Sequence, residues 1–260
     1  MPMIELSPGP IEYLVHAGDP GLNPLVFLHE GLGSAGMWGK LPRLLAARTG
    51  RSTVVYSRSG YGGSGPARLP REPGYMHTEA RVLRELLGEL EIDHPILVGH
   101  SDGASIAILY AGSAEVSADA LVLIAPHVIV EEVTLAGIRT AVDRFTDGSL
   151  ARKLAQFHND PERVFRGWTD IWLSPGFRDW DIRPALPGVA CPVLVIQGDA
   201  DQYGTAAQLD AIEHGAAGIV RRLELPETGH APHLEQPVVI AEAITDFLGL
   251  LDRDRTDLRG

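Results

Sequence analysis

Short apolar runs recur along the first half of the chain, at residues 25–28, 52–56, 95–98 and 120–125. Runs with so few polar positions are typical of strands that are covered on both faces. Between them, residues 38–48 and 76–91 carry apolar side chains at the spacing of one helix face. Alternating strands and helices of this kind predict a parallel sheet with helices packed on both sides.

The alternation breaks at residues 126–187, which we call the inserted segment. No strand pattern is present there, and helical stretches carry three of the four tryptophans. After it, strands at residues 191–196 and 219–225 flank a helix at 205–214, and a last helix ends near Leu251 before a charged tail. The alternation therefore resumes after one helical interruption.

We therefore expect an α/β fold with a mostly parallel central sheet of about eight strands and helices on both faces. Residues 3–6 and 11–16 form an edge hairpin of this sheet. Residues 1–125 and 188–260 form the core domain, and residues 126–187 form a helical cap or lid inserted after the sixth strand.

Composition narrows the class of protein. The 260 residues are 45% hydrophobic, enough for one sizeable core. The net charge of −12, without a run of Lys or Arg, disfavours nucleic acid and anionic membranes as partners. The single cysteine excludes an intrachain disulfide, and no apolar run of about 18 residues is present. We expect neither a leader peptide nor a membrane-spanning helix. We expect a cytoplasmic protein, monomeric or homodimeric, with no membrane partner.

One turn carries the strongest chemical signal. The strand at residues 95–98 leads into Gly99-His100-Ser101-Asp102-Gly103, and a helix of small residues follows. This pattern fits the nucleophile elbow, in which a serine on a sharp strand-to-helix turn exposes its hydroxyl above the sheet. A structural serine at a tight turn is the alternative, but the flanking strand and helix favour a nucleophile. The N–H of Asp102, at the helix start, can receive an oxyanion.

Further polar residues follow other strands. A glycine-rich loop, His29-Glu30-Gly31-Leu32-Gly33, comes directly after residues 25–28. It lacks the lysine followed by Ser or Thr that a phosphate-binding loop needs. We therefore interpret the N–H of Gly31 as the second oxyanion donor. Asp201 and His230 follow later strands, and ligands of open α/β sheets bind at the carboxyl ends of strands. The candidates occur in the order Ser, Asp, His.

Together these motifs resemble those of the α/β-hydrolase fold superfamily of serine esterases and lipases, over essentially the whole chain. The resemblance implies Ser101 as nucleophile, His230 as base and Asp201 as acid. No grouping of His, Asp and Glu has a recognisable metal-ligand spacing, so we expect no metal, and we expect no cofactor. It implies hydrolysis of a small carboxylic ester, lactone or thioester through an acyl-enzyme. Asp199 and His233 are rival candidates for the acid and the base. Glu30 departs from the pattern, since many relatives carry a second glycine there.

The substrate is less well defined by the sequence. We expect Glu30, Asp102, Trp168 and Trp172 to bind it, although the tryptophans also fit plain core packing and Asp102 also fits a helix-capping role. An elbow aspartate resembles that of esterases acting on α-amino-acid esters, in which a carboxylate holds the amino group. Carbon–carbon hydrolysis, perhydrolysis and a non-catalytic ligand receptor on the same fold are further alternatives.

Overall fold

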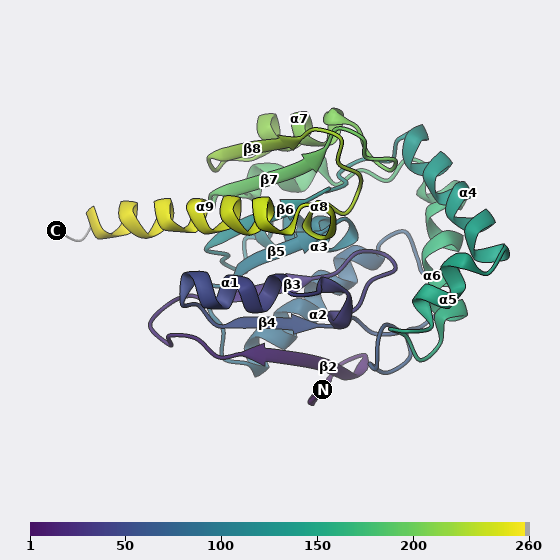
Figure 1. Cartoon of the computed structure of the whole chain (residues 1–260), viewed down its shortest axis with the longest axis horizontal. Helices are drawn as coiled ribbons and strands as arrows, with labels where there is room; N and C mark the ends of the chain where they lie inside the picture. Colours follow the sequence, from purple (N-terminus) through teal and green to yellow (C-terminus); the bar gives the residue numbers. More distant parts are fainter. Residues whose placement is uncertain (258–260) are drawn as a thin grey trace.

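The computed structural model describes residues 1–257 and contains one eight-stranded sheet in that range (Figure 1). The strand order is β1-β2-β4-β3-β5-β6-β7-β8. β1 with β2 and β2 with β4 pair antiparallel, whereas all other neighbours pair parallel. The predicted mostly parallel sheet is confirmed. The strands are β1 (Met3–Leu6), β2 (Gly9–His16), β3 (Leu25–Leu28), β4 (Thr53–Tyr56), β5 (Ile96–His100), β6 (Ala120–Ile124), β7 (Val193–Gly198) and β8 (Val220–Leu225).

Helices cover both faces of the sheet, as the alternation predicts. Helices α2, α3 and α7 pack on one face, and α1 and α9 pack on the other, in front of the strands in Figure 1. The helices outside the inserted segment are η1 (Ala35–Trp38), α1 (Leu41–Thr49), α2 (Tyr75–Glu89), α3 (Asp102–Ala111), α7 (Ala206–Gly215), α8 (Pro232–Glu235) and α9 (Pro237–Asp257).

The apolar runs are explained by this two-sided cover. In β5, Leu97 belongs to the cluster under α2 and α3, whereas Ile96 and Val98 belong to the cluster under α1 and α9. In a strand, successive side chains point to opposite faces, so a strand covered twice needs apolar residues at every position.

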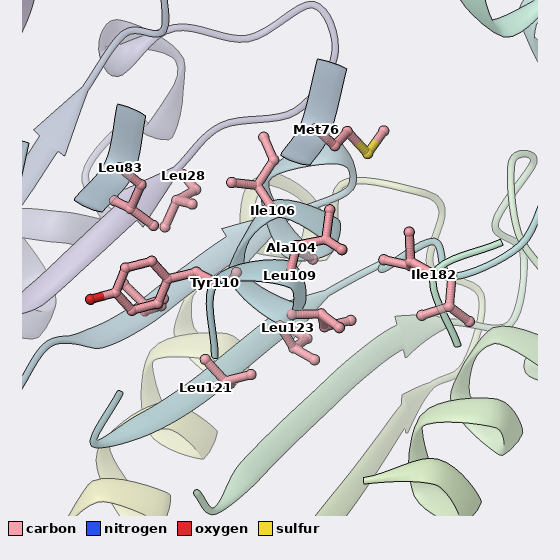
Figure 2. Close-up of a cluster of buried hydrophobic side chains, with 14 of the residues drawn as sticks. Leu28, Met76, Leu83, Ala104, Ile106, Leu109, Tyr110, Leu121, Leu123 and Ile182 are labelled. Atoms are coloured by element: carbon pink, nitrogen blue, oxygen red, sulfur yellow. The ribbon is translucent and has the colours of Figure 1, made fainter. Parts of the chain in front are cut away.

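Helix α3 is buried along its whole length. It packs on β3, β5 and β6 beside α2, and Figure 2 shows its side chains among those of β3, β6 and α2. A helix enclosed in this way must be apolar all round, which accounts for its high content of small and aliphatic residues. The residues labelled in Figure 2 include Ala104 and Ile106 of α3 and, from the elements around it, Leu28, Met76, Leu83, Leu121 and Leu123.

The inserted segment follows β6 and is helical, with an isolated bridge between Ile129 and Asp181. Figure 1 shows α4, α5 and α6 beyond the end of the sheet where the parallel strands finish. The elements of the segment are α4 (Glu132–Thr146), α5 (Ser149–Leu154), α6 (Pro161–Trp172), η2 (Pro175–Phe177) and η3 (Arg183–Gly188).

Two boundary predictions were wrong. The helix expected at residues 38–48 is divided, because Gly39 adopts a φ of 59° between η1 and α1. The last helix continues beyond Leu251 to Asp257, and Asp252 forms an ion pair with the buried Arg51 beside α1. The rest of the expected charged tail, residues 258–260, lies outside the described residues. Within residues 1–257, no helix is both long and apolar enough to span a bilayer.

Replacing Gly103 with alanine should destabilise the protein by about 1–3 kcal/mol, because the added Cβ would overlap the carbonyl oxygen of Leu28. Urea unfolding measures the change. Gly88→Ala in α2 is the matched control, since its Cβ would meet no atom within 4 Å, and it should be neutral or slightly stabilising. Equal stabilities of the two variants would contradict the close approach of α3 to β3.

Candidate active site

Ser101 occupies a strained turn between β5 and α3. Its φ of 52° and ψ of −118° are rare for a residue with a side chain, and such strain persists only where the surroundings enforce it. A Cβ on Gly99 would collide with the first turn of α3, and one on Gly103 would collide with the end of β3. Both elbow glycines are therefore required by packing.

His230 and Asp201 are brought together from the ends of β8 and β7. The Nδ1 atom of His230 lies 2.9 Å from each carboxylate oxygen of Asp201. The two loops touch through Gly198, where any side chain would overlap the main chain of Thr228. This close approach holds the two functional loops at a fixed separation.

Asp201 is better placed than Asp199 to act on the histidine. Its side chain is 1% exposed, and it also accepts hydrogen bonds from the N–H of Tyr203 at 2.8 Å and the amide of Gln197 at 3.3 Å. Burial alone would raise the pKa of Asp201, but the hydrogen bond and charge of His230 outweigh burial and lower it. Asp199 is exposed, so the choice of Asp201 agrees with the geometry.

Three further histidines surround His230. The ring centroids of His100 and His127 lie 5.1 and 5.6 Å from that of His230, and His233 packs 4.6 Å from His100. Burial lowers the pKa of His127 and of His233 to about 3, so both are neutral near pH 7. His233 packs against Trp38 and makes no contact with Asp201 in the described structure, which favours His230 as the base.

A cavity of about 250 Å³ lies where the strand ends meet the inserted segment. Its lining includes seven of the predicted site residues: Glu30, Gly31, Ser101, Asp102, Trp168, Trp172 and His230. Asp201 lies behind His230, outside the lining. Within residues 1–257 no hydrogen bond joins the Ser101 hydroxyl to the His230 ring, although both face the same cavity. Such bonds are often long without substrate and tighten when it binds.

Several residues that line the cavity were not predicted from the sequence. His127, Gln202 and Tyr203 follow β6 and β7, so the rule that ligands bind at strand ends could have identified them. Ile138 and Leu154 come from α4 and α5. An apolar helix face has the same sequence pattern whether it packs in a core or lines a cavity. No local signal therefore marks Ile138 and Leu154 as cavity residues.

The two predicted oxyanion donors have free N–H groups. Among the described residues, no acceptor takes the N–H of Gly31 or of Asp102, and both residues line the cavity. A side chain at residue 31 would overlap the ring of Trp168, so the loop approaches α6 closely. Trp168 and Trp172 are 8% and 2% exposed and also line the cavity, so each tryptophan serves in core packing and in the cavity wall.

Glu30, the departure from the family pattern, folds its carboxylate over Gly33. Its Oε2 lies 3.4 Å from Nδ1 of His100, whose Nε2 donates to the carbonyl of His230 at 2.7 Å. Burial would raise the pKa of Glu30, but the hydrogen bond and charge of His100 lower it well below its usual value. His100 thus connects the loop of Glu30 to the main chain of His230.

The Asp102 side chain points into a buried polar cluster. Oδ2 accepts a hydrogen bond from the Tyr75 hydroxyl at 2.7 Å and lies 3.8 Å from Nη2 of Arg58. Its hydrogen bond in the described structure is thus made with α2, and the carboxylate does not cap its own helix through a hydrogen bond. Across residues 1–257, no group of three His, Cys, Asp or Glu side chains is arranged to hold a metal ion.

Comparisons with known proteins agree with this architecture. Over 106 residues the chain is 34% identical to the sn-1-specific diacylglycerol lipase ABHD11 of Danio rerio, a match covering 40% of this chain and 32% of that protein. The enol-lactonase from Burkholderia xenovorans LB400 superposes with a TM-score of 0.74 at 19% identity, covering 95% of this chain and 100% of that one. The esterase EaEST from Exiguobacterium antarcticum gives 0.73 at 19% identity, covering 95% and 98%.

The two structural matches establish the fold alone, because identities this low say little about the substrate. A family model described as the alpha/beta hydrolase family matches residues 25–243, which is most of the chain. The eight-stranded sheet, its parallel order and its elbow are the features expected of that family. The chain belongs to the alpha/beta hydrolase family.

Proposed function

We propose that this hydrolase cleaves small carboxylic esters or lactones through a Ser101-His230-Asp201 triad. One observation carries the proposal: a serine on a strained elbow shares a cavity with a histidine whose far ring nitrogen lies 2.9 Å from a buried carboxylate. A serine hydroxyl is a weak nucleophile until a neighbouring base takes its proton, and this arrangement supplies the base and the group that orients it.

In this mechanism, Nε2 of His230 removes the hydroxyl proton while Oγ of Ser101 attacks the ester carbonyl. Asp201 accepts the Nδ1–H, fixes the tautomer and stabilises the imidazolium without becoming protonated. The imidazolium then protonates the departing alkoxide, leaving an acyl-enzyme. Water, activated by the same histidine, attacks the acyl carbon and releases the acid.

The negative charge that develops on the carbonyl oxygen is received by the free N–H groups of Gly31 and Asp102. Such donors act on charge that exists only in the transition state, so they raise the rate rather than the affinity. Removing one donor from a comparable site costs about 2.7–4 kcal/mol. The N-terminus of α3 adds a favourable dipole at the same place.

The cavity supports a small, uncharged acyl group. Ile138, Leu154, Trp168 and Trp172 give it an apolar wall, and we propose that the inserted segment acts as the cap that supplies this wall. The names of the three similar proteins denote lipase, lactonase and esterase activity. Oδ2 of Asp102 accepts from Tyr75 and lies near Arg58, whereas Oδ1 has no hydrogen-bond partner among the described residues. The second candidate substrate is therefore an α-amino-acid ester whose ammonium binds Oδ1.

A fluorophosphonate probe should label wild-type protein stoichiometrically, because it traps an activated serine in the elbow. Ser101→Ala should abolish labelling and esterase activity while leaving the melting temperature within about 2 °C. Ser105→Ala is the control: Ser105 is a buried serine of α3 whose hydroxyl donates to the carbonyl of His127, and this variant should still be labelled. A folded wild-type protein that resists labelling would favour the non-catalytic receptor alternative.

The acid limb of log kcat/KM against pH should have a slope of no more than one between pH 8 and 5. The pKa of Asp201 is lowered, so its carboxylate stays ionised in this range and adds no proton uptake to this limb. His233→Gln should keep the same limb, because the low pKa of His233 keeps it neutral. A slope of two above pH 5 would contradict the assignment of one base.

Leu154→Ala should shift the preferred acyl chain to greater length, because Leu154 lines the cavity and its removal adds room. With p-nitrophenyl esters, the ratio of kcat/KM for hexanoate to that for acetate should rise about fivefold or more. Leu186→Ala truncates an equally buried leucine away from the cavity and should leave the ratio unchanged. Equal ratios in both variants would mean that the acyl group binds elsewhere.

A further inference from the structure

A buried chain of polar contacts runs from the inserted segment to the oxyanion loop. Nε1 of Trp172 donates to the Tyr75 hydroxyl oxygen at 3.2 Å, and that hydroxyl donates to Oδ2 of Asp102 at 2.7 Å. The same Oδ2 lies 3.8 Å from Nη2 of Arg58. Nη2 in turn donates to the carbonyl of Glu30 at 2.9 Å. None of these side-chain contacts is part of the proposed triad.

All four side chains that make this series of contacts are buried. Arg58 is 0% exposed, Asp102 1%, Trp172 2% and Tyr75 7%. Hydrogen bonds and ion pairs in such a low-dielectric setting are strong, and a member left without its partner carries a large penalty. A buried arginine and a buried carboxylate are retained together only where each offsets the charge of the other.

Arg58 is one of three donors that fix the Glu30 carbonyl and, through the peptide bond, the direction of the Gly31 N–H. The carbonyl of Glu30 and the N–H of Gly31 belong to one planar trans peptide, so they point in opposite directions. The Glu30 carbonyl accepts hydrogen bonds from Nη2 of Arg58 at 2.9 Å, Nδ1 of His29 at 2.7 Å and the N–H of Gly33 at 3.1 Å. Nδ1 of His29 is the donor there, because its Nε2 accepts the N–H of Arg58. Holding this carbonyl inward turns the opposite N–H toward the cavity.

The other half of the site depends on the same cluster. The main chain of Asp102 supplies one oxyanion donor, yet its side chain carries a negative charge on the same residue. An uncompensated carboxylate so close would repel the developing oxyanion. Arg58 offsets that charge, and the Tyr75 hydroxyl binds the carboxylate away from the reacting atoms. Burial and the charge of Asp102 raise the pKa of Tyr75, so its hydroxyl remains a donor.

Building on the proposed esterase function, we propose that Tyr75 and Arg58 are positioning residues for the oxyanion hole. Arg58 orients the Gly31 N–H and neutralises Asp102, and Tyr75 holds the Asp102 carboxylate in place. Trp172, which lines the cavity and donates to Tyr75, connects the acyl-binding wall to this cluster. Substrate packed against Trp172 thereby contacts the same network that sets the oxyanion donors.

Tyr75→Phe tests the proposal, because it removes only the bridging hydroxyl. We expect kcat for a p-nitrophenyl ester to fall about 10- to 100-fold, with KM within about twofold, since misplaced oxyanion donors affect the transition state alone. Tyr56→Phe is the matched control: Tyr56 is also buried, but its hydroxyl has no hydrogen-bond partner among the described residues, so kcat and KM should stay within about twofold.

A second readout separates positioning from a structural role. A trifluoromethyl ketone accepts Oγ of Ser101 at its carbonyl carbon, the carbonyl electron pair becomes an alkoxide in the oxyanion hole, and the serine proton passes to His230. The corresponding secondary alcohol fills the same cavity without forming this bond. In Tyr75→Phe the inhibition constant of the ketone should rise by the factor lost in kcat, and that of the alcohol should stay unchanged.

The possible results are distinguishable. A reactive wild type whose Tyr75→Phe variant keeps full kcat, or loses affinity for ketone and alcohol equally, overturns the positioning role alone. A wild type that reacts with neither ester nor ketone overturns the proposed function and the positioning role with it. If Tyr75→Phe does not fold, Arg58→Lys, which keeps the charge but loses the planar guanidinium, is judged by the same ketone-to-alcohol ratio.

Discussion

The structure depends on the close approach of main chains at the carboxyl edge of the sheet. The turn after β5 fits only because Gly103 lets α3 begin directly against the end of β3, and Gly198 lets the loop after β7 lie against Thr228. These contacts involve rigid backbone, so they leave little freedom for the loops to shift. Ser101 keeps its strained φ of 52° because packing on both sides of the turn leaves no relaxed alternative.

Charges buried near this edge occur beside groups that offset them. Asp201 accepts from His230, Glu30 lies beside His100, and Asp102 lies beside Arg58 and Tyr75. His127 and His233 carry no such partner and are kept neutral by burial. A buried charge without compensation would cost more than the marginal stability of a domain allows, so the electrostatic arrangement follows from burial itself.

The departure at Glu30 shows how a family pattern can change while the site is kept. A glycine at this position would lack the carboxylate that lies beside His100. Here the glutamate folds back over Gly33 and reaches His100, which itself binds the carbonyl of His230. Glu30 therefore links the loop after β3 to the loop that carries His230.

Local pattern alone determined the order of strands and helices, the helical interruption at residues 126–187, the elbow around Ser101 and the order of the three triad candidates. These features are set by hydrophobic periodicity and by glycine and turn chemistry, which act over a few residues. Only the tertiary structure placed Asp201 rather than Asp199 beside the His230 ring, gave Trp168 and Trp172 a place in both core and cavity, and joined Arg58, Asp102, Tyr75 and Trp172 into one network. Those outcomes depend on contacts between side chains far apart along the chain, and no local window of sequence contains them.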